Sequence, residues 1–484
     1  MERFRTYEPD QQVFVNLDPA ETFGTDSFET YLVDSINAID LSGFWSASDR
    51  GGEAPYDPRA MLGLILYGIC QGIYSSRKLE HACRHDLGFM YVSGHNCPDH
   101  AAICRFLARH PIQIKEAFRN VVYIAHAKGY IDYHTLAIDG TKIRANVSKS
   151  FTGTIKDFRK RVGAIDFFIE KALKRLSEAS EGEKEGIARR IARAENDKDR
   201  ITEFLTQAAE IYNIAGTEKK QNMTDPDSRN MVFSDGTIRE AYNAQACVDD
   251  KGGLIVATEC SQDENDKKLL NPMLDSVVRP EGMDHEPVTV LADAGYWDPK
   301  ELSEAVANGN DVYVPSPEHP NPFFEPNKAA HQWIVEYEET GEGAFGKCPG
   351  GRVIKARETI RIYKNRDKGG PARVFYLMRS TECENCPFVA MCLPGNKKSR
   401  LVHISAVRIK YRSATRNIEA RINSPEGKRI YSRRMPLIEK VFADIKAVKG
   451  FRRFMRRGVT AVTTEWTLVC MAFNMRRMFA LHQG

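Results

Sequence analysis

Three acidic residues that lie far apart in the sequence have the local settings that metal-assisted phosphoryl transfer requires. Asp139 ends the alternating apolar run 136–138 and precedes a glycine, and Asp293 ends the apolar run 288–292. Glu439 lies in an amphipathic basic stretch, 431–446. Two carboxylates at strand ends and one on a helix can hold two Mg²⁺ ions. Such a pair activates a water or hydroxyl and stabilises the leaving oxygen of a phosphoryl transfer.

The stretch around Glu439 predicts a helix that packs on a sheet. On a helical wheel of about 100° per residue, one arc is apolar and consists of Met435, Ile438, Val441, Phe442 and Ile445. Glu439 and Lys446 fall side by side at the edge of this arc. We therefore expect Glu439 to reach the two strand carboxylates and Lys446 to reach a phosphate.

The elements before this helix alternate in the manner of a mixed sheet. After the strand with Asp139 we expect strands at 239–248 and 253–260, a helix at 265–278, the strand that ends at Asp293, a helix at 299–307 and a strand at 311–315. Three antiparallel strands followed by parallel ones is the order of a ribonuclease-H-like core. The predicted class is therefore α/β, in the form of a multidomain α+β chain.

Two insertions and an N-terminal domain complete the predicted organisation. Apolar residues repeat every three or four positions over 155–210, which predicts an antiparallel helical hairpin with its turn at 181–186. We assign residues 128–484 to the core, with insertions at 152–220 (the hairpin) and 316–430 (β-rich, with a cysteine cluster). Residues 1–127 form the helical N-terminal domain. Its helices near 58–66, 75–83 and 98–109 suit a helix-turn-helix DNA reader and any small helical bundle equally.

Charge is concentrated near Glu439. Residues 397–457 contain 19 lysines and arginines and 4 acidic residues, a net charge of +15, although the whole chain carries only +4. A basic segment in an otherwise acidic protein indicates a polyanionic partner, most plausibly nucleic acid. The alternative is a solvated basic face without a partner.

The cysteines divide into a cluster and scattered residues. Cys383 and Cys386 form a C-x2-C motif, with Cys392 after it and Cys348 upstream. Four such thiolates could bind a structural Zn²⁺, and buried reduced thiols are the alternative. The other seven are expected to be packing residues: Cys70, Cys83, Cys97, Cys104, Cys247, Cys260 and Cys470. An odd count of 11, without a signal peptide or a membrane span, predicts a cytoplasmic protein.

These motifs together resemble those of the DDE transposases of bacterial insertion sequences, in the group with a tyrosine-arginine-glutamate-lysine signature. The resemblance covers nearly the whole chain and rests on Tyr56–Pro58, Ser75–Arg77, Pro98–His100, Arg105–Phe106, Asp139–Lys142, Tyr242–Gln245, Leu254–Ala257, Leu291–Tyr296, Tyr431, Arg434, Glu439 and Lys446. The spacing from Arg434 to Glu439 is five rather than the commonest four, and Arg433 is an alternative to Arg434.

The resemblance implies a division of roles. Asp139 would bridge two Mg²⁺ ions, for which Mn²⁺ can substitute, while Asp293 and Glu439 would each hold one. The expected reaction is cleavage at element ends followed by attack of the freed 3′ hydroxyl on target DNA. The residues expected to contact DNA are Lys142, Tyr431, Arg433 or Arg434, and Lys446 at backbone phosphates, with Arg77 and Arg105 at the element ends. The partners implied are the terminal inverted repeats, target DNA and a second copy of the chain, in the nucleoid.

Two other functions remain open at this point. A ribonuclease-H-like nuclease that cuts without strand transfer would use the same three carboxylates and the same metals. A DNA-binding regulator derived from a transposase would keep the fold without the chemistry. The presence of all three carboxylates favours an active enzyme over the regulator.

Overall fold

The computed structural model describes residues 19–45, 55–213, 216–283, 286–317 and 410–483, together with the backbone of strands between 336 and 405. The chain forms two compact units. One comprises Met1–Val121 and Met471–Gly484, and the other comprises Val122–Cys470.

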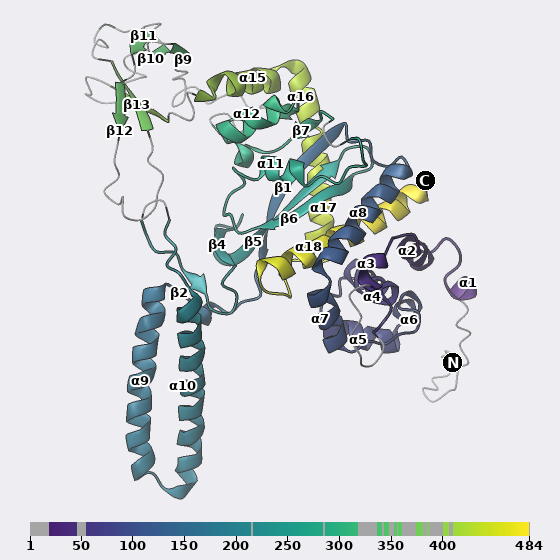
Figure 1. Ribbon diagram of the computed structural model, residues 1–484, viewed down its shortest axis with the longest axis vertical. Coiled ribbons are helices and arrows are strands. Elements are labelled where there is room, and N and C mark those ends of the chain that lie inside the picture. Colours follow the sequence, from purple (N-terminus) through teal and green to yellow (C-terminus); the bar gives the residue numbers. More distant parts are fainter. Residues whose placement is uncertain are drawn as a thin grey trace, which may run out of the picture. The chain divides into compact units, whose positions relative to one another are not determined.

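The first unit is helical (Figure 1). Its helices are α1 (Pro19–Thr22), α2 (Phe28–Asn37), α3 (Ser42–Trp45), α4 (Pro58–Cys70), α5 (Ser76–His85), α6 (Leu87–Val92), α7 (His100–Arg109), the first part of α8 (Pro111–Ala127) and the last part of α18 (Val459–His482). Helix α4 begins with Pro58, which has no N–H to leave unpaired, and Asp57 caps it by accepting from the Arg59 N–H. Because nearly every residue of α4 is buried, α4 forms the centre on which α2, α5 and α6 pack.

Sequence periodicity located much of this unit. The helices predicted near 58–66, 75–83 and 98–109 are confirmed as α4, α5 and α7. The other helices among residues 1–127 were not predicted individually; they are α1, α2, α3, α6 and α8. No helix in the described part of the chain is long and apolar enough to cross a membrane.

The second unit is built on a mixed sheet. Its strands are β1 (Thr135–Arg144), β4 (Arg229–Val232), β5 (Ile238–Asp249), β6 (Leu254–Ser261), β7 (Thr289–Leu291) and β8 (Asp311–Tyr313). The order is β4-β5-β1-β7-β8, and β6 also pairs with β5. Both fit on β5 because β4 pairs with residues 238–241 and β6 with residues 243–249.

The strand directions agree with the predicted order. Strand β5 is antiparallel to both β1 and β6, whereas β1–β7 and β7–β8 are parallel. The remaining elements of this part are α11 (Leu270–Asp275), the 3₁₀ turn η2 (Ala294–Tyr296), α12 (Pro299–Ala307), α15 (Arg412–Asn423), α16 (Pro425–Tyr431), α17 (Arg434–Ala443) and the π-helical turn η4 (Asp444–Val448). Helix α17 packs on β1 (Figure 1), so the sequence around Glu439 does cover the sheet.

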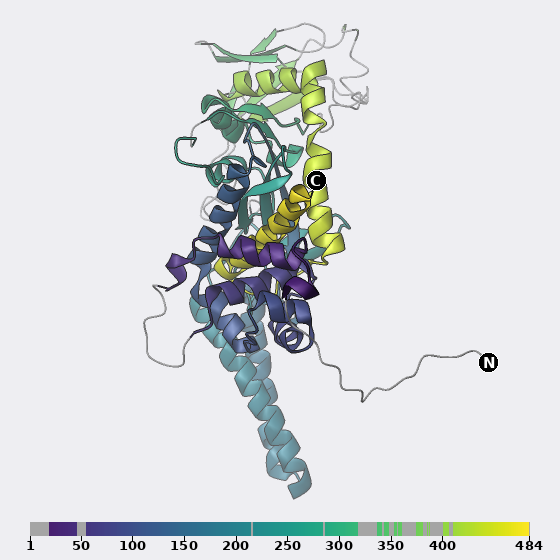
Figure 2. The same cartoon turned by 90° about the vertical axis from the view of Figure 1, so that its right-hand side faces the viewer.

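A long helical pair lies between β1 and β4. Helices α9 (Ile155–Glu178) and α10 (Glu181–Gln207) run side by side in both views (Figures 1 and 2). Phe158 and Phe204 form the buried part of their seam, together with Ile155 and Ile201. The short elements at the base of the pair are η1 (Lys149–Phe151), β2 (Thr152–Gly153) and β3 (Gln221–Asn222).

Further strands follow β8. They are β9 (Glu336–Thr340), β10 (Gly343–Lys347), β11 (Val353–Lys355), β12 (Arg357–Ile360), β13 (Val374–Ser380) and β14 (Arg400–Ser405). They form two three-stranded sheets, β11-β10-β9 and β12-β13-β14.

Several predicted boundaries were wrong. The hairpin turn lies at 179–180 rather than 181–186, because Ser180 and Glu183 form a capping box that starts α10 ahead of its glycines. The helix predicted at 265–278 is limited to α11, and β8 ends at Tyr313. The apolar arc predicted for α17 also differs, since Met435 is 57% exposed and Arg434 lies on the buried face with Ile438 and Val441.

Candidate active site

Strand pairing brings Asp139 and Asp293 to the same place. Strands β1 and β7 are parallel neighbours, and their last registered pair is Ala137 with Leu291. Each aspartate stands two residues beyond that pair. Because side chains two positions apart on a strand point to the same face, the register directs both carboxylates to one side of the sheet.

Arg434 joins these two carboxylates. Its Nη2 lies 2.8 Å from Asp139 Oδ2 and 3.9 Å from Asp293 Oδ2. The Arg434 side chain is only 10% exposed, and it comes from the first residue of α17, which packs on β1. A buried guanidinium therefore supplies the positive charge between two strand-end carboxylates.

The surroundings of Asp139 act in opposite directions on its protonation. Burial, which removes water from the charged form, raises the pKa of Asp139 to about 7. The positive charge of Arg434 opposes that rise, and the negative charges of Asp293 and Asp266 add to it. The Oδ1 of Asp139 accepts the backbone N–H of Gly140 at 2.8 Å. Asp139 is thus a carboxylate whose ionised form depends on nearby cations.

Tyr431 and Lys446 flank the same place. Burial raises the pKa of Tyr431, Arg434 lowers it, and Asp293 and Asp139 raise it further. Burial lowers the pKa of Lys446, while the charge of Asp139 opposes that change. Both side chains therefore lie within electrostatic reach of the carboxylates.

Glu439 lies on α17, where its side chain is exposed. No group of three or more His, Cys, Asp or Glu side chains among the described residues is arranged to hold a metal ion. The wheel assumed an α-helix up to Lys446, but η4 is a π-helical turn, and its wider winding changes the direction in which Lys446 points relative to Glu439.

The other predicted DNA contacts have separate environments. Arg433 pairs with Asp250, so it is Arg434 and not Arg433 that reaches Asp139. Lys142 Nζ donates to the Val232 carbonyl at 2.8 Å. In the helical unit, Arg77 is exposed. Arg105 lies 3.9 Å from Asp99 and lines a cavity of about 540 Å³.

Sequence reasoning missed a polar network beside the aspartates. Asp266 Oδ1 accepts hydrogen bonds from Asn243 Nδ2 at 2.7 Å and from Gln245 Nε2 at 2.8 Å. Asn243 and Gln245 are each 1% exposed, and the buried Tyr296 hydroxyl donates to Gln245 Oε1. The available signal was the pair of amides at alternate positions of the mainly apolar run 241–248, since buried amides need partners.

The proposed zinc ligands lie outside the described residues. This applies to Cys348, Cys383, Cys386 and Cys392. The described cysteines form no disulfide. Cys83, Cys247, Cys260 and Cys470 are buried, as expected of packing residues, whereas Cys104 is exposed and does not fit that expectation.

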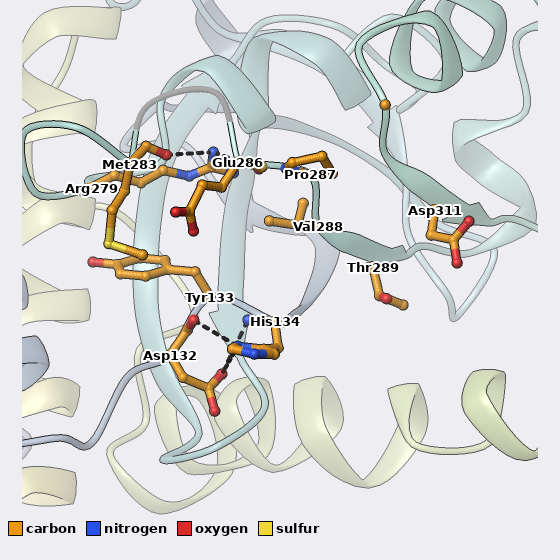
Figure 3. Close-up of a pocket in the computed structure, with 11 residues that line it drawn as sticks. Asp132, Tyr133, His134, Arg279, Met283, Glu286, Pro287, Val288, Thr289 and Asp311 are labelled. Carbon is orange, nitrogen blue, oxygen red and sulfur yellow. Dashed lines mark hydrogen bonds and ion pairs between the residues drawn. The ribbon is translucent and has the colours of Figure 1, made fainter.

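A cavity in the second unit lies at the opposite ends of the parallel strands. It has a volume of about 360 Å³, and its lining includes Tyr133, Thr289 and Asp311, near the starts of β1, β7 and β8 (Figure 3). Arg279 donates to the Met283 carbonyl at its rim. Asp139 and Asp293 follow further along β1 and β7, so this cavity is not part of their site.

Comparison with known families gives two matches. Residues 347–479 match the transposase DDE domain, and residues 28–109 match a transposase domain of the DUF772 family. The first match contains Tyr431, Arg434, Glu439 and Lys446, while Asp139 and Asp293 lie before it. Searches of curated proteins and of solved structures found no significant match. On the two family matches, the chain is a DDE transposase of the insertion-sequence type.

Proposed function

We propose that this transposase cuts DNA at the ends of its insertion sequence and joins the freed 3′ hydroxyl to target DNA. The observation that carries the proposal is the pair Asp139 and Asp293, each with one carboxylate oxygen directed at the buried cation Arg434. A site that draws two carboxylates to one positive charge is suited to divalent cations, since phosphoryl transfer depends on positioning and on neutralising negative charge.

The ligand atoms fit Mg²⁺, or Mn²⁺ in its place. Asp139 Oδ1 and Asp293 Oδ1 each accept one backbone N–H, from Gly140 and Gly295, both at 2.8 Å. These bonds fix the carboxylates while leaving each Oδ2 for a cation, and carboxylate oxygen is the ligand that Mg²⁺ prefers. Bound there, the cations would supply the activated nucleophile and stabilise the leaving oxygen. We propose Asp139 and Asp293 as ligands and Glu439 as the third.

Arg434 has a further part in this proposal. Its guanidinium balances the carboxylates when no divalent cation is bound, and it would turn to a DNA phosphate when one is. Tyr431 and Lys446, which also lie within electrostatic reach of the carboxylates, are suited to contact the same phosphate. Such contacts hold the DNA backbone in register and read no sequence.

The other parts of the chain are assigned by the same proposal. Residues 1–127 would recognise the element ends, with Arg77 and Arg105 as contacts. Residues 128–484 would form a ribonuclease-H-like core, with the helical hairpin and the β-rich region inserted in it. Two copies would hold two ends together. The core assignment is supported by the central sheet, in which β6, β5 and β1 are antiparallel neighbours and β7 and β8 continue parallel to β1.

The test uses DNA that carries the sequences flanking the gene. Purified protein should cut one strand at each end in Mg²⁺ and then join the 3′ end to a plasmid. Cutting without joining would indicate a nuclease. DNA binding without cutting, in either Mg²⁺ or Mn²⁺, would contradict the proposed chemistry.

A further inference from the structure

We propose that Asp266 is a positioning residue of this active site, whose fixed negative charge helps Asp139 and Asp293 to attract divalent cations. The inference rests on the proposed function and adds a residue that the two-strand register does not predict. Asp266 lies between β6 and α11, outside both family matches.

Two amides hold one oxygen of Asp266. Asn243 Nδ2 and Gln245 Nε2 both donate to Oδ1, at 2.7 and 2.8 Å. Both amides come from β5, two residues apart, so their side chains point to the same face. Two amide donors on one oxygen fix the orientation of the Asp266 carboxylate.

The amides are themselves held. The Tyr296 hydroxyl donates to Gln245 Oε1, and the Trp466 Nε1 donates to the Gln245 carbonyl at 2.8 Å. Tyr296 and Trp466 are both completely buried. Tyr296 lies in the turn η2, which Asp293 caps, so one network connects the turn after Asp293 to the carboxylate of Asp266.

Two glycines make room for this network. A Cβ on Gly140 would lie 2.1 Å from Gln245 Nε2 and 2.7 Å from Asp266 Oδ1. A Cβ on Gly295 would lie 2.8 Å from Asp293 Oδ1 and 3.3 Å from Asp266 Oδ2. Because the same Cβ position at Gly295 would be close to an oxygen of Asp293 and to an oxygen of Asp266, these two carboxylates lie on either side of one point. The glycines that follow the two predicted aspartates therefore allow a third one to come close.

The three aspartates share one arrangement of their oxygens. In each, Oδ1 accepts N–H donors of the protein. Oδ2 of Asp139 and of Asp293 is directed to Arg434, and no described residue donates to Oδ2 of Asp266. The negative charge of Asp266 acts on Asp139, whose pKa it helps to raise. Because two amides of β5 hold its Oδ1, Asp266 is assigned an electrostatic and positioning role.

The experiment compares Asp266→Asn with Asp263→Asn. The side-chain amide introduced by Asp266→Asn can still accept from Asn243 and Gln245 through its oxygen. Its NH₂ replaces an oxygen that accepts nothing from the described residues, so mainly the charge is lost. Asp263 is the matched control, because it is exposed, lies in the same loop and contacts Ser261. Two quantities are measured in the full-length protein: Mn²⁺ affinity without DNA, by calorimetry, and the Mn²⁺ concentration for half-maximal DNA cleavage.

We expect Asp266→Asn to lower the Mn²⁺ affinity and to raise the Mn²⁺ concentration for half-maximal cleavage, each by about 10–100-fold. This is the usual effect of losing a group that supports metal ligands. Saturating Mn²⁺ should restore its cleavage rate, and Asp263→Asn should match the parent. Gly140→Ala, which displaces the same network, should shift Mn²⁺ affinity in the same direction. Equal behaviour of the two Asn variants would overturn the inference. Loss of cleavage at all Mn²⁺ concentrations would make Asp266 a direct ligand and overturn the positioning role.

The proposed function can fail separately. If the parent binds Mn²⁺ and Asp266→Asn binds it more weakly, but neither cuts DNA, the role of Asp266 in cation binding stands while the nuclease proposal falls. If the parent binds no Mn²⁺ and cuts no DNA, both are overturned.

Discussion

Arg434 Nη2 donates a hydrogen bond to Asp139 Oδ2 at 2.8 Å, across 295 positions of sequence. The bond connects the helix that carries the signature residues to the strand that carries the first aspartate. It also gives the buried Asp139 carboxylate a counter-charge, since an unpaired buried charge is costly whereas a paired one is tolerated.

Replacing Arg434 should therefore destabilise the protein in a manner that divalent cations relieve. Arg434→Met leaves Asp139 and Asp293 without their ion-pair partner, and the free energy of unfolding should fall by about 3 kcal/mol. Thermal or urea unfolding measures this, and added Mn²⁺ should raise the stability of the variant more than that of the parent.

Arg433→Met is the matched control. Arg433 is adjacent, half-exposed and paired with Asp250, so its loss should cost no more than about 1 kcal/mol and should not respond to Mn²⁺. Equal losses of unfolding free energy in the two variants would show that the contact of Arg434 with Asp139 stabilises the protein no more than the contact of Arg433 with Asp250.

DNA affinity should depend steeply on salt because of the basic segment 397–457. Each phosphate contact contributes a slope of about −0.9 to the dependence of log K on log salt concentration. Arg452 is exposed, and its Nε donates to the carbonyl of Lys446 in η4. Arg452→Gln should flatten the slope by about one unit. Lys251→Gln, in an exposed turn outside the segment, should leave it unchanged, and an equal change in both variants would argue against a local contact.

Stability should vary with pH through Glu465. Burial raises the pKa of Glu465 to about 7, although the backbone N–H groups of Met455 and Arg456 oppose that rise. Below about pH 4.5 the group is protonated in both the folded and the unfolded state. As pH rises towards 7, the unfolded carboxyl ionises first, so the folded state loses stability, by up to ~3 kcal/mol.

Urea unfolding at pH 5 and pH 8 tests this direction. Glu465→Gln should become progressively more stable relative to the parent as pH rises, because the amide cannot ionise and its oxygen can still accept a backbone N–H. Glu281→Gln, at an exposed position, should show no such trend. If the difference in unfolding free energy between Glu465→Gln and the parent does not change with pH, the Glu465 carboxyl does not cause the pH dependence of stability.

Glu439 is proposed as the third ligand and is exposed in the structure. If α17 presents it to the cations once DNA is bound, Glu439→Gln should reduce cleavage by at least about 10²-fold, comparable to removing a catalytic electrostatic group, with DNA binding unchanged. Lys440→Gln, at the next exposed position, should cut normally. Full activity of Glu439→Gln would remove it from the site and leave the aspartates as the cation-binding groups.

Periodicity and turn chemistry predicted the elements that depend on local sequence. The strand carrying Asp139, the hairpin β5–β6 and helix α12 were all located, because each has its own alternation or capping signal. The strand order also predicted that β1 and β7 are neighbours, which brings Asp139 and Asp293 to the same place. The capping box at Ser180 was overlooked, so the turn between α9 and α10 was misplaced.

Contacts made by tertiary packing were not predictable in the same way. Arg434 appeared as a phosphate-binding residue, because a wheel cannot show that its guanidinium meets two carboxylates. The π-helical turn at η4 has no simple periodic signature, so Glu439 and Lys446 were expected to lie side by side. Asp266 lies in a polar loop without periodicity, and only its amide partners on β5 point to the role that we propose for it.

The most direct test of the account is Mg²⁺-dependent cleavage of DNA carrying the gene's flanking sequences by the parent, Asp139→Asn and Asp293→Asn. The account predicts that the parent cuts, that both variants lose at least about 10²-fold in rate, and that all three bind the DNA equally in a gel-shift assay. Undiminished cleavage by either variant would contradict it.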